Sequence, residues 1–203
     1  YQIAAACNFL QRTVANGGEI LFVGTKRQLR EIVKELADTT GMYCVSERWL
    51  GGTLTNNVTI RKSITKMAEI DGTLNSDAAK SMKKKEIAGL SALVVIDVYN
   101  EINAVREANK LNIPIVAIVD TNGDPSLVDY PVAANDDAVK SVQIITNLFA
   151  EAIKVAREIY RKKDTEERDA AEAAKKVAQE KADDAEKEEK ADKPRRAPRR
   201  KPA

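Results

Sequence analysis

Basic and amide side chains gather at two points of this sequence where an apolar run gives way to a polar turn. The first is Gly24-Thr25-Lys26-Arg27, and the second runs from Glu47 to Asn57 and holds the only Trp, a Gly pair and two adjacent Asn. Lys and Arg position a phosphate backbone, amides bond to sugars and base edges, and an indole can stack on a base. These residues therefore favour the binding of a nucleic acid. The candidate binding residues are Lys26, Arg27, Arg48, Asn56, Asn57, Arg61, Lys62 and Lys66.

Three residues of the second corner are expected to shape it as structural anchors, namely Trp49, Gly51 and Gly52. A buried Trp removes a large area from water, and the Gly pair lets the chain turn over it. Thr55 or Asn56 can cap the helix that follows. A packed Trp beside a turn is an ordinary structural feature, so the evidence for binding is the concentration of polar and basic residues around it.

Arg48 differs from the other cations because a carboxylate precedes it. Glu47 could hold the guanidinium in place, and a guanidinium can bond to a phosphate through two nitrogens. We therefore expect the other cations to contribute modestly and Arg48 to contribute more.

The residues provide weaker support for catalysis. Gly24-Thr25-Lys26 follows an apolar run as phosphate-binding turns do, but neither G-x-x-x-x-G-K-[ST] nor G-x-G-x-x-G occurs. Asp97 and Asp120 each end an apolar run and could form an acidic site, although an Asp there more often caps the next turn. The sequence has no His, and no Ser or Cys has a plausible base beside it. We expect no catalytic residue, no metal and no cofactor.

Two functions of other classes stay open from the residues alone. One is a phosphate- or nucleotide-ligand enzyme on a doubly wound fold. The other is a receiver-like signalling domain in which Asp97 accepts a phosphoryl group. A receiver requires an acidic cluster after its first strand, and Gly24-Thr25-Lys26 is basic instead.

Apolar runs and helical patterns alternate about five times between residues 1 and 153. The apolar runs at 19–24, 42–45, 92–97 and 115–120 predict strands, the first of them buried, and 128–133 predicts a short edge strand that tolerates a Pro. Buried strands separated by amphipathic helices are typical of an α/β fold, with a parallel sheet between two helical layers. Ligands of such sheets bind at the carboxyl ends of the strands, which is where the polar corners fall.

The helical patterns carry further expectations. Thr25-Lys26-Arg27 is predicted to open the second helix, and residues 57–88 to form an inserted helical hairpin. Asn135-Asp136-Asp137 is predicted to cap the long last helix, with Thr146 at the margin of its apolar face. From residue 161 the composition is rich in Lys, Glu and Ala and then in Arg and Pro, so residues 161–203 are expected to be a helical or disordered extension of the domain at 1–160.

Charge is distributed unevenly along the chain. Residues 26–85 hold 12 Lys and Arg against 7 Asp and Glu, whereas residues 86–151 hold 3 against 10. The net charges of these halves are therefore +5 and −7. Because phosphates attract the first half and repel the second, we expect the first to face a nucleic acid. No run of about 18 apolar residues occurs, so no membrane segment is expected.

Several motifs in the same order and spacing make the sequence similar to a known family. They are Ile20–Lys26, Arg48–Asn56, Ile113–Asn122, Asp124-Pro125 and Asn135–Ala138. On these motifs the chain is identified as a member of the S-two family of small ribosomal subunit proteins, of bacterial type. The resemblance covers about residues 1–153.

The resemblance implies a flavodoxin-like three-layer sandwich with a protruding helical hairpin, and a structural role in translation. Together with the alternation of strands and helices, it predicts five parallel strands in the order 2-1-3-4-5. It implies docking on small-subunit ribosomal RNA at the head–body junction, next to other small-subunit proteins including protein one, in the cytoplasm. Three departures stand out. The family's His-containing segment before the first helix is absent, the hairpin at 57–88 is short, and the extension from about residue 161 goes beyond the shared part.

Overall fold

The computed structural model of the chain describes residues 1–56, 58–60, 62 and 90–191, with side chains as far as residue 165. Most of the hairpin predicted at 57–88 therefore lies outside the described residues. Contacts divide the chain into two units, Tyr1–Tyr160 and Arg161–Ala203. The sheet, its helices and the site all belong to the first unit.

Five parallel strands form one sheet in the order β2-β1-β3-β4-β5. The predicted fold class and strand order are thus confirmed. Because β1 lies between β2 and β3, the chain changes direction across the sheet there, and such a switch point leaves a crevice at the carboxyl edge. The strands are β1 (Glu19–Val23), β2 (Tyr43–Val45), β3 (Leu90–Ile96), β4 (Ile115–Val119) and β5 (Tyr130–Ala133).

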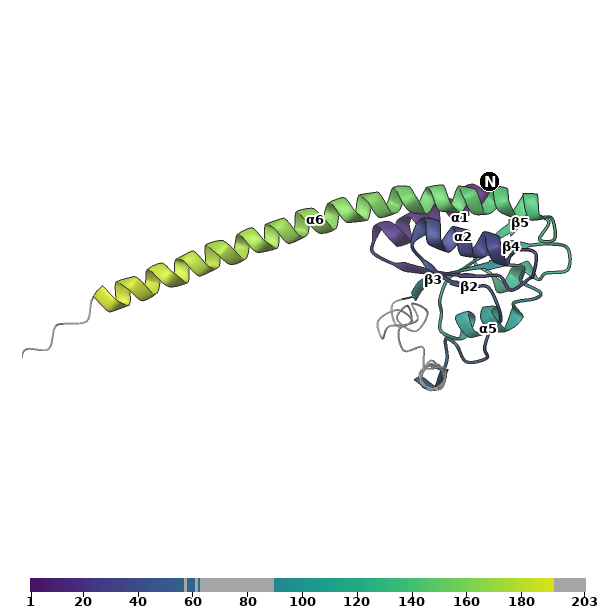
Figure 1. Cartoon of the computed structure of the whole chain (residues 1–203), viewed down its shortest axis with the longest axis horizontal. Coiled ribbons are helices and arrows are strands. Elements are labelled where there is room, and N and C mark those ends of the chain that lie inside the picture. The colour runs from purple at the N-terminus through teal and green to yellow at the C-terminus, as the bar shows by residue number, and fades with distance from the viewer. Residues whose placement is uncertain (57, 61, 63–89, 192–203) are drawn as a thin grey trace, which may run out of the picture. The chain divides into compact units, whose positions relative to one another are not determined.

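Helices cover both faces of the sheet. Figure 1 shows α1, α2 and the beginning of α6 on one face and α5 on the other. Successive strand residues point to opposite faces, so Phe22 and Val94 pack with the first group of helices, whereas Leu93 and Val95 pack with α5. The helices are α1 (Gln2–Ala15), α2 (Arg30–Thr40), α5 (Ile102–Lys110) and α6 (Val139–Ala191).

Helix α2 begins at Arg30, later than the sequence predicts. The backbone N–H and the hydroxyl of Thr25 both donate to Glu101, which follows β3. The ammonium of Lys26 is bound to carboxylates after β3 and β5. These bonds to neighbouring loops keep Thr25 and Lys26 out of a first helical turn.

Helix α6 begins at Val139, so the predicted cap Asn135-Asp136-Asp137 lies just before the helix and bonds to the turn that leads into it. One residue of the helix also does not lie where predicted. The side-chain oxygen of Asn135 accepts bonds from the N–H groups of Asp137 and Ala138, each at 2.8 Å. Thr146 was expected at the margin of the apolar face, yet it is 1% exposed. A buried position is acceptable because its hydroxyl donates to the carbonyl of Val142 at 3.0 Å.

Candidate nucleic-acid interface

The two predicted corners follow neighbouring strands and therefore meet at the carboxyl edge of the sheet. Gly24 to Arg27 follow β1, and Ser46 to Asn56 follow β2, which pairs with β1 in parallel. Among the predicted binding residues, Arg27, Arg48, Asn56 and Lys62 are exposed. Asn57, Arg61 and Lys66 lie outside the described residues.

Lys26 is held inside the domain by three carboxylates. Its ammonium lies 2.7 Å from Asp97, 2.9 Å from Asp136 and 2.9 Å from Asp137. Burial of the ammonium lowers its pKa, but the bonds to Asp97, Asp137 and Asp136 raise the pKa more, so it lies above its usual range. The Lys26 side chain is only 19% exposed. It joins the loops after β1, β3 and β5, and its assignment as a binding residue stays a prediction.

The two aspartates that could have formed an acidic site bond within the protein. Asp97 is 1% exposed; one of its oxygens binds Lys26 and the other accepts the N–H of Asn100 at 3.1 Å. Asp120 accepts the N–H of Thr121, and this bond contributes most to a lowered pKa. Both therefore tie down the turns that follow their strands, which is the commoner role of an Asp at that place.

The environment of Asp136 is less favourable to its charged form than that of Asp97 or Asp120. Burial raises its pKa, Lys26 opposes the rise, and repulsion from Asp97 adds to it. One of its oxygens bonds to Lys26, and the other has no hydrogen-bond partner within the described part of the chain. This carboxylate therefore depends strongly on Lys26 for its charge.

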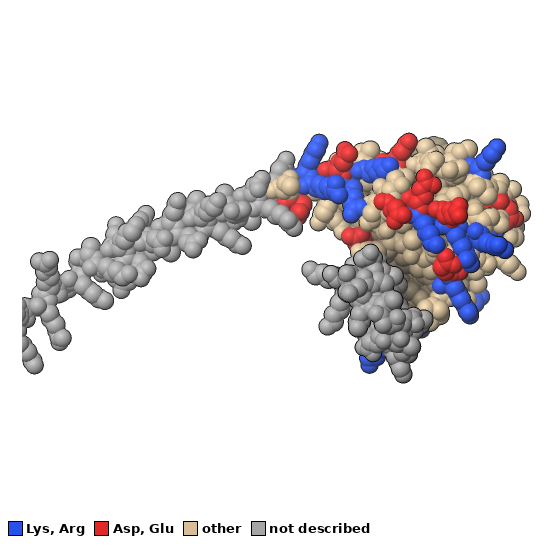
Figure 2. Space-filling model, in the orientation of Figure 1, with Lys and Arg blue, Asp and Glu red and all other residues tan. Residues whose placement is uncertain are grey.

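Glu47 does not hold Arg48 as predicted. Its carboxylate instead binds Lys34 at 3.0 Å and Arg30 at 2.5 Å, both on α2. The bond from Lys34 and the attraction of Arg30 lower the pKa of Glu47. Two cations on an adjacent helix thus bind this carboxylate in place of the neighbour in sequence. Figure 2 shows acidic and basic side chains interspersed on the face that it presents.

The loop from Trp49 to Thr55 closes around one carboxylate of α5. The indole N–H of Trp49 and the N–H of Gly52 donate to Oε1 of Glu107 at 3.0 and 2.7 Å. Oε2 accepts the N–H groups of Leu54 and Thr55 at 3.0 and 3.2 Å, and the Thr55 hydroxyl at 3.3 Å. Burial raises the pKa of Glu107, but the bonds from Trp49 and the loop backbone lower it more. The carboxylate therefore stays ionised, and each of its two oxygens accepts at least two hydrogen bonds.

The predicted anchors have different environments in this loop. Trp49 is half-buried and packs against the core beneath α5. Gly52 has a φ of +88°, which disfavours any other residue, whereas a side chain at Gly51 would meet open space. Gly52 therefore has a conformational reason to be Gly.

Sequence reasoning missed Glu107, because an acid on an amphipathic helix is ordinary and this one lies more than 50 residues from the loop. The only available signal is indirect. A Trp indole and the N–H groups of a Gly-rich turn need an acceptor when they are covered. Which carboxylate supplies it depends on the tertiary structure.

Two other features are absent from the described part of the chain, namely a metal site and a helix that could span a membrane. No group of three or more Cys, Asp or Glu there could hold a metal ion. No described helix is long and apolar enough to cross a bilayer.

The chain is similar to a well-populated family of proteins. The model of the family "Ribosomal protein S2" matches residues 1–92 and 88–156. Small ribosomal subunit protein uS2 of Francisella tularensis subsp. tularensis (strain SCHU S4) is 46% identical over 189 residues, covering 83% of this chain and 79% of the relative. The uS2 protein of Francisella tularensis subsp. novicida is 48% identical over 169 residues, covering 73% and 71%. That of Bifidobacterium animalis subsp. lactis is 41% identical over 174 residues, covering 74% and 57%.

Proposed function

The chain belongs to the ribosomal protein S2 family, and from this premise we propose that it binds small-subunit ribosomal RNA as a structural constituent of the small ribosomal subunit. Its contribution to translation is that of a scaffold protein and not of an enzyme. By the same resemblance, it docks at the head–body junction, beside other small-subunit proteins including protein one, in the cytoplasm.

The observation that supports RNA binding most directly is that the chain on both sides of the Trp49–Thr55 loop carries exposed cations, while Glu107 holds the loop itself. Arg27, Arg48 and Lys62 are exposed, and the amide of Asn56 is exposed as well. Cations of this kind neutralise phosphates without requiring a defined base sequence. The loop itself is tied to α5 through Glu107.

The polar side chains that a nucleotide enzyme or a receiver would need are already engaged. Lys26 is shared by three aspartates, and Asp97 bonds through both oxygens. Thr25 donates to Glu101 and cannot also serve a phosphate in the same geometry. These contacts support a structural role for the inner part of the sheet edge.

A charge-reversal experiment tests which surface docks. The test variant carries Arg27→Glu, Arg48→Glu and Lys62→Glu, and the control carries Arg12→Glu, Lys110→Glu and Lys154→Glu, three exposed cations from α1, α5 and α6. Both variants change the net charge by the same amount, so nonspecific attraction falls equally. Each is mixed with small subunits depleted of their own S2-family protein and sedimented at physiological salt.

We expect the test variant to lose most of its co-sedimentation and the control to retain it. For single reversals among the three, the slope of log affinity against log salt should fall by about one unit. Lys26 is left unchanged because reversing it would disturb the fold. Equal incorporation of a folded test variant and the control would show that this edge is not the docking surface.

A further inference from the structure

We propose that Glu107 is a positioning residue that holds the Trp49–Thr55 loop in the shape that rRNA binding requires; this inference rests on the proposed function above. Glu107 itself need not touch RNA. It acts by fixing the backbone that carries Arg48 at one end of the loop and Asn56 at the other.

The first argument is the number of donors that one side chain satisfies. Five donors from four loop residues converge on the two oxygens of Glu107, at 2.7 to 3.3 Å. The loop also makes its own turns, through bonds from Thr53 to Leu50 and from Asn56 to Gly52. Those local bonds shape each turn, whereas the carboxylate ties the turns to a different element of the fold.

The second argument is the rigidity of the support. Glu107 lies on α5 between Val105 and Ala108, which are 0% exposed, and Ala104 on the same helix is also 0% exposed. These residues pack against Leu93 and Val95 of the central strand β3. The loop is therefore positioned relative to the core of the domain. Binding groups held in this way do not have to be ordered when the partner arrives.

The third argument concerns charge. The N–H groups of Gly52, Leu54 and Thr55 form a concave set of donors of the kind that binds anions. Glu107 already occupies them, so these N–H groups are not available to a phosphate. The outward side chains of Arg48 and Asn56 are left to meet the RNA, and their placement depends on how firmly the occupied loop is held.

Positioning and simple electrostatics predict opposite results for Glu107→Gln. Removing a negative charge near RNA should strengthen binding if charge alone matters. A Gln has one oxygen and one NH₂ group, so it would face some of the loop donors with a donor of its own. If positioning matters, the loop loosens and binding weakens despite the more favourable charge.

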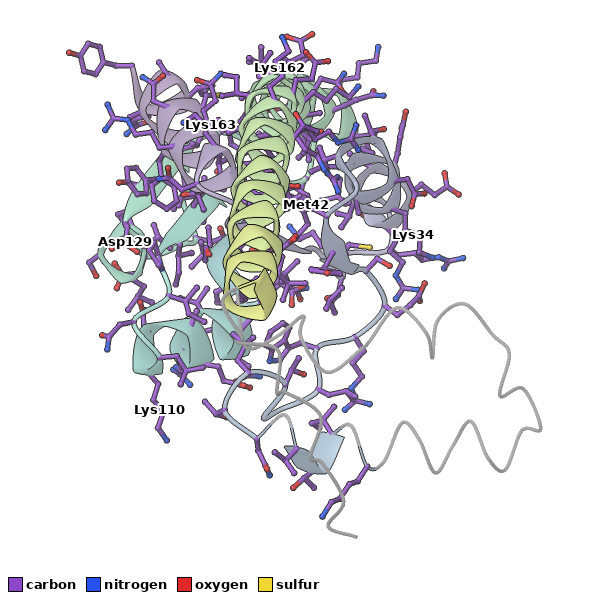
Figure 3. The ribbon with its side chains drawn as sticks, turned by 90° about the vertical axis from the view of Figure 1, so that its left-hand side faces the viewer. Lys34, Met42, Lys110, Asp129, Lys162 and Lys163 are labelled. Atoms are coloured by element: carbon purple, nitrogen blue, oxygen red, sulfur yellow. The ribbon has the colours of Figure 1, made fainter. Side chains whose placement is uncertain are left out.

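The experiment compares Glu107→Gln, Glu107→Asp and Asp129→Asn with the wild type. Glu107→Asp keeps the charge but shortens the side chain, which keeps the test informative if the Gln variant unfolds. Asp129 is a matched control because its carboxylate accepts one backbone bond, from Ile115. It projects from the opposite side of the domain to Lys34 on α2 (Figure 3). Each variant also carries Arg48→Ala in a second series.

Two readouts report on the loop and on the partner separately. Trp49 is the only Trp, so its fluorescence emission reports directly on the loop in the free protein. Affinity is measured by titrating depleted small subunits at physiological salt. We expect Glu107→Gln to remain folded, to shift the Trp49 emission to the red, and to bind about tenfold more weakly, as loss of preorganisation of a few side chains predicts. Glu107→Asp should fall between Glu107→Gln and the wild type.

The Arg48→Ala series separates positioning from loss of stability. If Glu107 acts through the loop, Arg48→Ala should weaken binding less in the Glu107→Gln background than in the wild type, because the two changes act on one unit. In the Asp129→Asn background its effect should be unchanged.

Equal or stronger binding by Glu107→Gln, or an unchanged Trp49 emission, would overturn the positioning role while leaving the proposed function intact. The proposed function fails in a different way, namely if the wild type does not bind the depleted subunits.

Discussion

At the scale of single residues, this domain separates cations that serve the fold from cations that face the solvent. Lys26 bonds to two carboxylates that are almost fully buried, with side chains of Asp97 and Asp136 each 2% exposed. Lys34 makes its ion pair with Glu47 at the surface, where their side chains are 52% and 63% exposed. Burial determines how much each pair contributes, because water screens the second and hardly reaches the first.

Substituting these two lysines tests this difference. We expect Lys26→Met to lower the free energy of unfolding by about 3–5 kcal/mol, since it leaves two buried carboxylates without their cation. Lys34→Met, a matched control, should cost less than about 1 kcal/mol. Urea denaturation at neutral pH measures both. Adding Asp136→Asn to Lys26→Met should restore part of the lost stability, because it removes one of the unpaired charges. Similar losses for the two lysine variants, or no gain from Asp136→Asn, would contradict the internal role of Lys26.

At the scale of elements, the end of α2 shows how a helix terminus is tied to a distant helix. Gly41 ends α2 with a φ of +66°, a conformation that Gly adopts without steric cost. A guanidinium nitrogen of Arg157, on α6, donates to the carbonyl of Thr40 in the last turn of α2. A side chain at Gly41 would collide with that guanidinium. The left-handed backbone is therefore the main reason for Gly at this terminus, and a side chain there would also displace the Arg157 guanidinium.

Gly41→Ala should lower the free energy of unfolding by about 2 kcal/mol, from the left-handed backbone and from displacement of Arg157. Gly51→Ala is the control, because its added methyl group meets no atom within 4 Å and its φ is not in the left-handed region. It should leave the stability unchanged or raise it by up to about 1 kcal/mol by restricting the unfolded chain. Thermal or urea unfolding measures the free energy of unfolding of both variants. An equal change at the two positions would show that the backbone conformation of Gly41 does not require Gly.

At the scale of the whole molecule, the chain divides into the unit Tyr1–Tyr160 and the extension Arg161–Ala203. The unit Tyr1–Tyr160 contains the sheet and its core. Its last residues belong to α6, where Ala156 is 1% exposed and Arg157 caps α2. Of the residues after Arg157 whose burial the structure describes, 158–165, none belongs to the buried core. We therefore expect the stability of the unit not to depend on the extension.

Truncation tests this expectation. A chain that ends at Thr165 should unfold with the same urea dependence as the full chain, and its free energy of unfolding should differ by no more than about 0.5 kcal/mol, as for surface changes. A chain that ends at Ile153 loses Ala156 and Arg157 and should be less stable by about 2–4 kcal/mol. If the first truncation were as harmful as the second, the unit would extend beyond Tyr160.

Much of the fold could be predicted from the sequence because its signals are local. Four apolar runs identified strands, and their alternation with amphipathic helices predicted a parallel sheet. With the family resemblance added, the predicted order of the strands is the one that the structure has, β2-β1-β3-β4-β5. The motifs around Lys26, Trp49 and Asp120 identified the family, since they are contiguous stretches. Strand identity and family resemblance are both properties of neighbouring residues, and they require no knowledge of what lies opposite them.

Only the tertiary structure determined which partner each polar side chain has. Lys26 meets Asp136, 110 residues later, and Trp49 meets Glu107, 58 residues later. Sequence neighbours suggested a pair between Glu47 and Arg48 instead, and the fold brought Arg30 and Lys34 of α2 to that carboxylate. A charged or hydrogen-bonding group accepts any suitable partner within about 3 Å. The sequence alone therefore determined which groups need partners, whereas packing of the helices on the sheet determined which partners come within reach.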